Sequence, residues 1–288
     1  MQKEWTIESP TELLKFLFQV MPNKSRNSVK SILSRGQVVV NGKGTTQFNE
    51  PLKPGDTVEI KTRVVPVDIK LKGVQIVHED EDLIVIEKDA GLLTIATDTE
   101  KEQTAYRELS DYLRKTQPKR QLFIVHRLDR DTSGLLIFAK NKDVQQKLQN
   151  AWKESVKERT YLALVQGKVA KDGTVTSWLT EGKTHMMHSS KKDNGGKKAI
   201  THYKVAKASR DMSLLQVNLE TGRKNQIRVH MQDIGHPVVG DKKYGATLNP
   251  IRRLGLHAYA LSFIHPRTGK TMRFESDIPK AFLKMFFG

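Results

Sequence analysis

The chain has 288 residues, of which 37% are hydrophobic, so it is long enough for one large and one small domain with buried cores. Lysine and arginine total 49 against 32 aspartate and glutamate residues, and the formal net charge of +17 predicts attraction to a polyanion. The absence of cysteine excludes disulfides, thiol catalysis and thiolate-bound metal.

A membrane surface is a poor candidate for that polyanion, because no run approaches the roughly 20 apolar residues of a membrane span. The N-terminal segment carries acidic side chains where a signal peptide would be basic, and it lacks a small-residue cleavage site. We therefore expect a cytoplasmic protein that binds RNA or DNA. The alternative interpretation of the charge is a solubilising surface.

Residues 11–62 are predicted to form a small module of two helices and short strands. The first helix is expected to begin at Thr11, and the second to be capped by Ser25 and to end at Gly36. Their apolar residues at helical spacing are Leu13, Leu14 and Leu17, then Val29, Ile32 and Leu33.

Two turn motifs follow these helices. Asn41-Gly42, directly after the apolar run QVVV, is a strong hairpin signal. Pro54-Gly55-Asp56 predicts a second turn before a closing strand.

Four basic side chains lie on or beside the second predicted helix: Lys24, Arg26, Lys30 and Arg35. Arg26 and Lys30 are four residues apart and share a face, where like charges repel unless a polyanion lies across them. The segment KSRNSVKSILSRGQVVVNGK resembles the RNA-binding module named after ribosomal protein S-four. That resemblance implies that Arg26 and Lys30 contact RNA; the alternative is an ordinary solvated helix face.

Residues 1–62 are thus predicted to be a small RNA-binding domain, residues 63–72 an extended linker, and residues 73–288 the larger domain. In the larger domain strand-like and helix-like stretches alternate irregularly, which predicts an α+β fold on a mixed, largely antiparallel sheet. Strands are expected in VQIVHEDEDLIVIEK, FIVHRL, GLLIFAK, YLALVQGKV, THYKVAKA and SLLQVNLE.

Two helices and one loop of the larger domain can also be predicted. Asn141 is expected to cap a helix with Val144, Leu148 and Trp152 on one face, and a second helix is expected from about Lys224 to Asp233. Residues 182–199 read as a polar basic loop, which contributes Lys183, Lys191, Lys192, Lys197 and Lys198.

The segment Asp129-Arg130-Asp131-Thr132-Ser133-Gly134 places two carboxylates and two hydroxyls between apolar strands, where rigid elements can hold a reactive group. Paired carboxylates could bind a metal, as in a nuclease, with Asp241 as the only comparable carboxylate downstream. Ser133 with His126 could suggest acyl transfer, although the GxSxG setting is missing. A turn capped by Asp129 and Thr132 is the purely structural alternative.

The segment HRLDRDTSGLLIFAK resembles the signature of the RluA/RluD-type pseudouridine synthases, whose catalytic aspartate follows Arg-Leu. The resemblance continues, in the family's order, through EKDAGLLT, ERTYLALVQG, LETGRKNQIRVHMQDIGHPVVGDKKYG and LHAYALSFIHPRTGK. It implies that Asp129 is the catalytic carboxylate, that Tyr161 lies near the reacting base and that Arg228 is the partner of the aspartate.

These residue types suit the isomerisation of uridine to pseudouridine, which cuts the glycosidic bond, turns the uracil and rejoins its carbon 5 to the ribose. A carboxylate can act as nucleophile or cation stabiliser, and a guanidinium beside it favours its charged form. The ring of Tyr161 could stack on the extruded base, and its hydroxyl could assist proton removal. No redox change occurs, so we expect no cofactor and no metal.

The uridine must leave its stack, at a cost of a few kcal/mol, and contacts to phosphates must offset that cost. Arg223 and Lys224 at the start of a helix are expected to bind phosphate. His126 and Arg127 are expected to position the flipped nucleotide, although a structural hydrogen bond is an equal alternative for His126. Tyr244 is expected to fix a turn.

The family and the accessory module favour large-subunit ribosomal RNA as the substrate, with tRNA as the alternative. A catalytically idle RNA-binding or assembly factor and a metal-dependent nuclease are the rival interpretations. We expect a monomer with no obligatory protein partner. Departures from the family's pattern are Asp89 where proline is usual, Asn225 where histidine is usual, and Arg159 where lysine is commoner.

Overall fold

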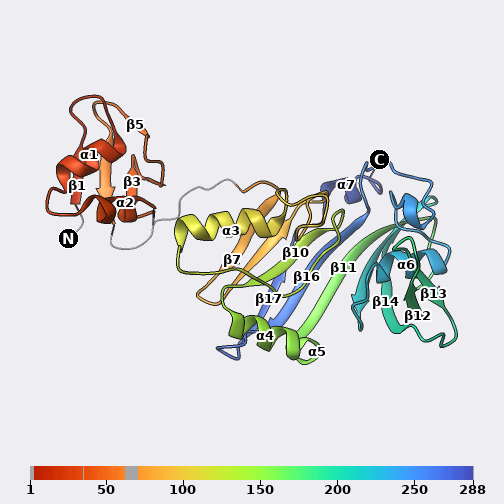
Figure 1. The fold of residues 1–288 in the computed structure, drawn as a ribbon. Coiled ribbons are helices and arrows are strands. Elements are labelled where there is room, and N and C mark those ends of the chain that lie inside the picture. Colours follow the sequence, from red (N-terminus) through yellow and green to blue (C-terminus); the bar gives the residue numbers. More distant parts are fainter. Residues whose placement is uncertain (1–2, 35, 62–70, 288) are drawn as a thin grey trace. The chain divides into compact units, whose positions relative to one another are not determined.

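A computed structural model describes residues 3–34, 36–61 and 71–287, and these form two compact units (Figure 1). One unit comprises residues 1–72 with 107–122, and the other residues 73–106 with 123–288. Arg35 and residues 63–70 of the predicted linker lie outside the described residues. The predicted domain boundaries at residues 62 and 73 therefore stay predictions.

In residues 3–34 and 36–61 of the first unit, two helices lie beside a four-stranded sheet in the order β1-β6-β3-β4 and a two-stranded pair, β2-β5. The helices are α1 (Leu13–Val20) and α2 (Arg26–Ser34). The strands are β1 (Lys3–Thr6), β2 (Thr11–Glu12), β3 (Val38–Val40), β4 (Lys43–Thr45), β5 (Pro51–Leu52) and β6 (Thr57–Ile60). Their common core includes Leu13, Leu17, Val29, Leu33 and Val58.

The local signals of this unit are largely confirmed. The hydroxyl of Ser25 accepts a hydrogen bond from the Ser28 N–H (3.2 Å), as an N-cap should. Asn41 and Gly42 both have positive φ, 49° and 78°, which is the geometry of a type I′ hairpin turn. The predicted start of the first helix is wrong by two residues, because Thr11 and Glu12 pair with β5 as a short strand.

The described residues of the second unit form an eleven-stranded sheet in the order β13-β12-β14-β15-β11-β16-β10-β8-β7, with β17 on β16 and β9 on β10. The strands are β7 (Val74–Glu79), β8 (Leu83–Lys88), β9 (Phe123–Ile124), β10 (Ser133–Ala139), β11 (Val156–Gln166), β12 (Gly173–Glu181), β13 (Met187–Ser190), β14 (Lys197–Ala208), β15 (Met212–Leu219), β16 (Leu256–Ile264) and β17 (Thr271–Glu275). The predicted α+β class with a mixed, largely antiparallel sheet is confirmed.

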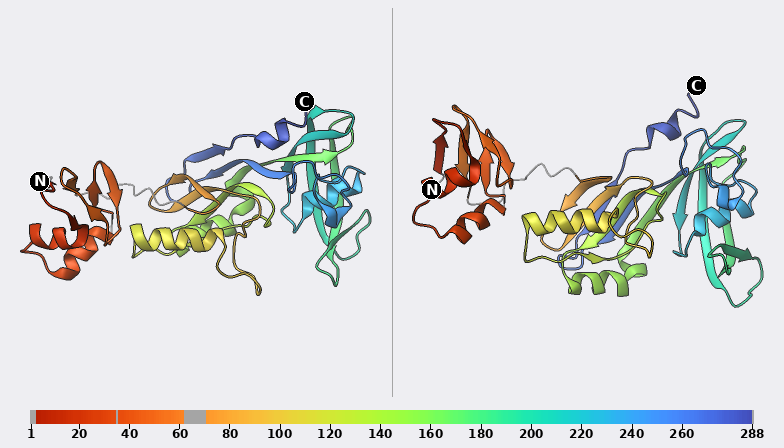
Figure 2. Two further views of the ribbon diagram at one scale, coloured as in Figure 1. Left: turned by 90° about the horizontal axis from the view of Figure 1, so that it is seen from above. Right: turned by 45° about the horizontal axis from the view of Figure 1, so that its top comes forward.

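Short helices accompany this sheet. They are α4 (Lys142–Asn150), α5 (Trp152–Ser155), α6 (Gln226–Asp233), the 3-10 helix η1 (Lys242–Tyr244) and α7 (Lys280–Leu283); α3 (Ala105–Thr116) crosses the boundary between the two sets of residues. Asn141 caps α4 as predicted, accepting a hydrogen bond from the Val144 N–H (2.9 Å). Figures 1 and 2 show α6 lying against β13 and β14, which its contacts confirm. No helix in the described ranges is long and apolar enough to cross a membrane.

The prediction of a loop at 182–199 is wrong for Met187–Ser190, which form strand β13 on the edge of the sheet, and for residues 197–199, which begin β14. This strand pairs with β12, with Trp178 opposite Ser190 and Glu181 opposite Met187. The side chain of Met187 is buried beside Tyr244. The hydrogen bonds to β12 and this one buried apolar side chain therefore stabilise a strand, although most residues of the segment are polar.

Among the described strand pairs of this sheet, only β10 and β16 run parallel, with Ser133 opposite His257 and Gly134 opposite Ala258. Gly134 has φ 110°, and a Cβ built on it would lie 2.2 Å from the carbonyl oxygen of Ala258. Glycine is therefore required for this close approach. Because the two strands are parallel, the loops that precede them lie at the same end of the sheet, and one of these loops carries Asp129.

We predict that Gly134→Ala destabilises the second unit by at least about 3 kcal/mol, because the added methyl group clashes with backbone in a strained conformation. Gly269→Ala is the matched control: its φ is also positive (70°) but nothing lies within 4 Å, so the cost should be only about 1–2 kcal/mol. Urea unfolding followed by tryptophan fluorescence in a Trp5→Phe background reports on the second unit alone. Equal losses in the two variants would contradict this account of the β10–β16 contact.

Candidate active site

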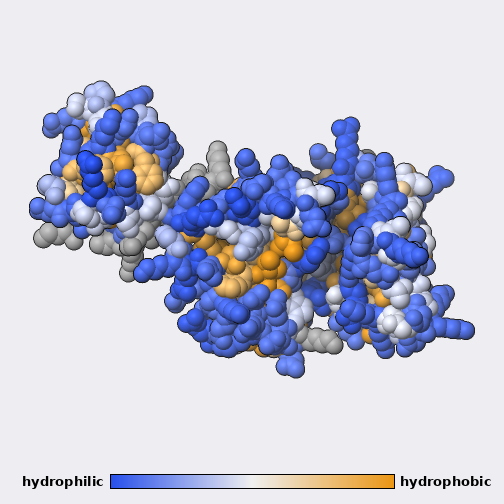
Figure 3. Space-filling view, viewed as in Figure 1, coloured by the Kyte–Doolittle hydropathy of each residue, from blue (hydrophilic) through white to orange (hydrophobic). Residues whose placement is uncertain are grey.

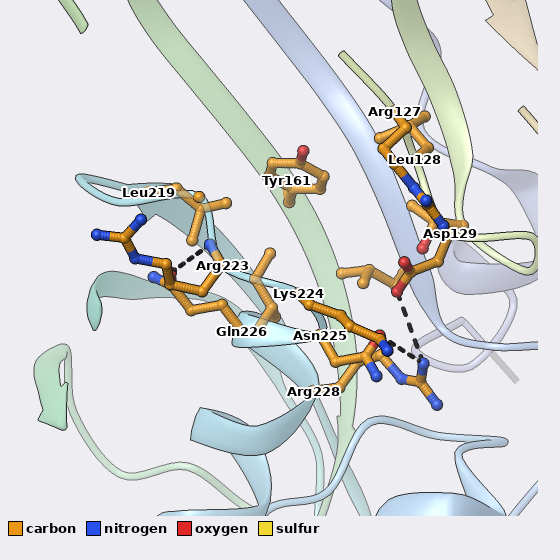
Figure 4. A pocket seen from close by; sticks show the side chains of 14 residues that line it. Arg127, Leu128, Asp129, Tyr161, Leu219, Arg223, Lys224, Asn225, Gln226 and Arg228 are labelled. Atoms are coloured by element: carbon orange, nitrogen blue, oxygen red, sulfur yellow. Dashed lines mark hydrogen bonds and ion pairs between the residues drawn. The ribbon is translucent and has the colours of Figure 1, made fainter. Parts of the chain in front are cut away.

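Asp129 lies in a tight turn immediately before β10. The turn is closed by the Thr132 N–H, which donates to the main-chain oxygen of Asp129 (3.1 Å). The carboxylate is not used to cap this turn, since no main-chain N–H of the described residues donates to it. It points instead toward Arg228, with 3.6 Å between Oδ2 and Nη1 (Figure 4). Within the described residues, the Asp129 side chain thus makes none of the main-chain hydrogen bonds that the capped-turn alternative requires.

Arg228 is held on its other side by Asp241. The Nε and Nη2 atoms of Arg228 donate to the two carboxylate oxygens of Asp241 at 2.6 and 2.8 Å, and the Asp241 side chain is only 1% exposed. Burial lowers the pKa of Arg228, but the hydrogen bonds and charge of Asp241 and the charge of Asp129 outweigh this, so the net shift is upward. The guanidinium is therefore a fixed cation whose third nitrogen, Nη1, faces Asp129.

Sequence reasoning considered Asp241 only as a possible metal ligand. Because both of its oxygens accept from Arg228, this carboxylate supports the arginine. Among the described residues, Asp80, Asp82 and His265 lie within metal-binding distance of one another, and none of them is a predicted site residue. The periodicity of the sequence gave no signal for the pairing with Arg228.

Asn225 and Tyr244 complete the support of Arg228. Asn225 has φ 53°, a left-handed conformation that asparagine tolerates better than most residues, and its Oδ1 accepts from Arg228 Nη1 (3.1 Å). Its Nδ2 donates to the hydroxyl of Tyr244 (3.1 Å), whose ring lies 4.8 Å from the Arg228 guanidinium carbon. The fully buried Tyr244 thus fixes local structure, and the departure at Asn225 preserves a brace for the arginine.

Lys88 anchors the loop that carries Asp129. Its fully buried ammonium donates to the main-chain oxygens of Asp89 (2.8 Å), Leu92 (2.7 Å) and Arg130 (3.0 Å), and burial lowers its pKa to about 8. The departure at Asp89 is accommodated, since its N–H donates to the Gly73 oxygen (2.9 Å), a bond that proline could not make. Sequence reasoning missed Lys88, although a lysine that ends an apolar strand is a usable signal.

A cavity of about 370 Å³ opens beside Asp129, within the size range of small-ligand sites. Tyr161 on β11, Arg127, and the turn before α6 line it, as Figure 4 shows. Its apolar walls are Leu128, Leu219, Ile227 and Leu256. The pKa of the Tyr161 phenol is raised, mainly by burial. The charge of Arg159 lowers it in part, and the charge of Asp129 raises it further. Asp129, Tyr161 and Arg228, predicted from three distant segments, therefore face one cavity.

Of the residues predicted to bind the substrate, only some lie at this cavity. Arg127, Arg223 and Lys224 line the cavity, with Arg223 Nε donating to the Lys198 oxygen (3.1 Å) and Lys224 Nζ paired with Glu181 (2.5 Å). Lys224 thus already has a counter-charge, whereas the other N–H groups of the Arg223 guanidinium make no hydrogen bond within the described residues.

His126 does not line this cavity. Its Nε2 accepts from the Ile137 N–H (3.2 Å) and its ring lies 4.9 Å from that of Trp152. The structure therefore favours the structural alternative for this histidine.

Arg26 and Lys30 belong to the first unit, where both are exposed on α2 and Arg26 lies over the Phe18 ring (5.4 Å).

The acyl-transfer interpretation also lacks its geometry. Ser133 Oγ lies 2.7 Å from His257 Nδ1 and accepts from Arg253 Nη2 (2.6 Å), so its partner is not His126. Ser133 and His257 are both buried and absent from the cavity lining. Burial, with a contribution from Arg253, lowers the pKa of His257 to about 4, which makes it a weak base. This network packs β10 against β16.

Comparisons with known proteins point to one family. The family model for RNA pseudouridylate synthases matches residues 82–233. The chain is 34% identical over 258 residues to the Bacillus subtilis (strain 168) protein named uncharacterized RNA pseudouridine synthase YjbO, covering 88% of this chain and 90% of that one. It is 33% identical over 289 residues to ribosomal large subunit pseudouridine synthase D of Escherichia coli (strain K12), covering 93% and 87%.

Among solved structures, human RNA pseudouridylate synthase domain containing 1 is 28% identical, with a TM-score of 0.58 over 73% of this chain and 85% of that chain. Human RNA pseudouridylate synthase domain containing 4 has a TM-score of 0.59 at 22% identity, which shows a shared fold. Both matches extend over most of the human chains.

Two buried histidines, His230 and His257, and the half-buried His126 predict an acid-sensitive second unit. Burial lowers the pKa of His126 to about 3 and those of His230 and His257 to about 4, whereas an unfolded imidazole titrates near 6.5. The unfolded chain therefore binds more protons, so their stabilisation is complete above about pH 6.5 and is lost as the pH falls toward 4. Each histidine should contribute a slope of about 1.4 kcal/mol per pH unit below about pH 6.

Urea unfolding of the Trp5→Phe protein between pH 7.5 and 5.0 measures this slope, in a window where most carboxylates do not titrate. His257→Gln should reduce the slope by about one proton relative to the parent protein. A stability that stays constant down to pH 5.0 would contradict the assignment of neutral buried imidazoles.

Proposed function

The chain belongs to the RNA pseudouridylate synthase family, and on that premise we propose that it isomerises uridine in large-subunit ribosomal RNA, with Asp129 as the catalytic carboxylate. The observation that carries the assignment of Asp129 is its place in the cavity: it faces Arg228 and shares the cavity with Tyr161. The relatives named as large-subunit synthases support the choice of RNA.

In this proposal the carboxylate of Asp129 acts at the ribose or at the base as the glycosidic bond breaks, either as a nucleophile or as a counter-charge to a cation. The freed uracil turns, its carbon 5 joins the ribose, and the proton lost from carbon 5 is balanced by one gained at nitrogen 1. Arg228 orients the carboxylate and keeps a positive charge beside it throughout. Every atom of the product comes from the substrate, so no cofactor is required.

We assign the ring of Tyr161, rather than its hydroxyl, to the substrate. A raised pKa keeps the phenol protonated at neutral pH, so the hydroxyl is a poor base for removing the proton from carbon 5. The ring lines the cavity and offers an aromatic face for the extruded uracil, which would recover part of the stacking lost on flipping.

Arg127, Arg223 and Lys224 on the cavity wall, with Arg26 and Lys30 on the exposed face of α2, are the proposed phosphate contacts. Specificity would then come from RNA shape and a few bases. We propose that the enzyme acts as a cytoplasmic monomer without a protein partner. A tRNA substrate and an idle RNA-binding role are the alternatives that the following experiments separate.

Asp129→Asn should lower the rate of pseudouridine formation at least about 10³-fold while leaving RNA affinity within about twofold, because the amide cannot supply the charge. The measurement is conversion of uridine in an unmodified large-subunit ribosomal RNA transcript, in the presence of a chelator. Wild-type protein that binds this RNA without converting any uridine would favour the idle binder. Chelator-sensitive cleavage of the RNA would favour the nuclease.

Asp241→Asn should lower kcat by about 10- to 100-fold with little change in KM, because Arg228 loses one of the two acceptors that aim it at Asp129. The effect on folding is monitored separately by urea unfolding. Asp233 is an exposed carboxylate on the same helix as Arg228, so Asp233→Asn is the matched control and should retain wild-type kinetics. An unchanged kcat in Asp241→Asn would show that Arg228 needs no such support.

A further inference from the structure

A second cavity lies between the loop of Asp129 and the segment 240–254. It measures about 480 Å³, and the basic residues around it are Arg130, Arg228, Lys242, Lys243, Arg252 and Arg253. Arg228 lines both this cavity and the candidate active site. The two cavities therefore share a wall.

A close backbone contact brings these basic residues together. Gly240 has φ 78°, and a Cβ built on it would lie 2.2 Å from the carbonyl oxygen of Arg253. Its N–H also donates to the Leu248 oxygen (2.9 Å), so the segment folds back on itself. As a result Lys242 and Lys243, which follow Gly240, lie beside Arg252 and Arg253, although about ten residues separate the pairs in sequence.

The charge of this cavity is not balanced by its own carboxylates. Arg228 is paired with Asp241, and Arg130 with the neighbouring Asp131 (3.2 Å). Lys242, Lys243 and Arg252 are exposed, and their side chains make no hydrogen bond or ion pair within the described residues. Three cations that share one cavity without a counter-charge repel one another, unless an anion enters.

Arg253 gives the cavity a fixed cation. Its Nη2 donates to Ser133 Oγ (2.6 Å) and to the Leu256 oxygen (3.2 Å), and its guanidinium carbon lies 5.4 Å from the Phe282 ring centre. Ser133 begins β10 and Leu256 begins β16, so the parallel pairing of these strands sets this guanidinium beside the loop of Asp129. A preorganised cation costs little conformational entropy on binding an anion.

We propose that this cavity binds the phosphodiester backbone of the RNA strand that flanks the target uridine. The proposal rests on the proposed function of Asp129: Arg228 lines both cavities, so the second cavity adjoins the one assigned to the target uridine. A phosphate group matches the unpaired cations of Lys242, Lys243 and Arg252, and hydrophilic residues predominate around α6 on the face shown in Figure 3. Contacts here offset the cost of unstacking the uridine.

The test compares three proteins binding an unmodified large-subunit ribosomal RNA transcript over a salt series. Lys242→Gln/Lys243→Gln/Arg252→Gln removes the three unpaired cations, and Lys242→Arg/Lys243→Arg/Arg252→Lys keeps their charge. The control, Lys142→Gln/Lys270→Gln, neutralises two exposed lysines beyond the far ends of β10 and β16. Circular dichroism melting confirms that each variant is folded.

The log-log slope of affinity against salt should fall by about two to three in the neutralised triple variant, since each phosphate contact contributes about 0.7 to 0.9. The charge-preserving variant should keep the wild-type slope, and so should the control. An unchanged slope in the neutralised variant would overturn the proposal. The proposal would also be overturned if the slope fell by as much in the control as in the neutralised variant, because the effect would then be one of net charge.

This readout is separate from the proposed function. Wild-type protein that binds the transcript with a steep salt dependence but forms no pseudouridine would refute the function while leaving the phosphate site intact. Equal binding of an acidic polypeptide such as polyglutamate, abolished by the same three substitutions, would assign the cavity to an acidic protein partner and overturn the RNA assignment.

Discussion

Arg228 is the side chain on which the proposed site depends. A guanidinium has three nitrogens in a rigid plane, and here two of them are bound to Asp241. The third is then directed toward Asp129 without freedom to turn away, with Asn225 and the ring of Tyr244 closing the remaining sides. A flexible lysine at the same place would supply the charge but not this orientation.

The sheet supplies the matching constraint on Asp129. Its parallel pair, β10 and β16, brings two loops to one end of the sheet, and Gly134 allows the approach that this pairing requires. Lys88 then ties the loop of Asp129 to the end of β8 through three main-chain oxygens. The loop of Asp129, the side chain of Arg228 and the basic segment 240–254 are thus positioned by rigid elements, as the proposed site requires.

Local signals predicted much of the fold. The hairpin at Asn41-Gly42 and the caps at Ser25 and Asn141 depend on neighbours in sequence, and all three are confirmed. The misassigned segments form strands because other strands offer unpaired edges: Thr11 pairs with the distant Leu52, and Met187–Ser190 pairs with β12, which directly precedes it. No local pattern encodes such an edge.

Some residues of the candidate site could likewise be predicted from the sequence, and others could not. Motif resemblance named Asp129, Tyr161 and Arg228, but Asp241 and Lys88 act through contacts that periodicity does not reveal. For His126 the sequence alone was equally compatible with a substrate contact and with a structural hydrogen bond. In the structure its Nε2 accepts a hydrogen bond from the Ile137 N–H.

The most direct test of the central claim is a carbodiimide reverse-transcription map of pseudouridine in large-subunit ribosomal RNA from wild-type and deletion strains. The deletion strain is complemented with either the wild-type chain or Asp129→Asn. We predict that the deletion removes at least one modified site, that the wild-type chain restores it, and that Asp129→Asn does not. A map unchanged by the deletion would contradict the substrate, and restoration by Asp129→Asn would contradict the catalytic role of the carboxylate.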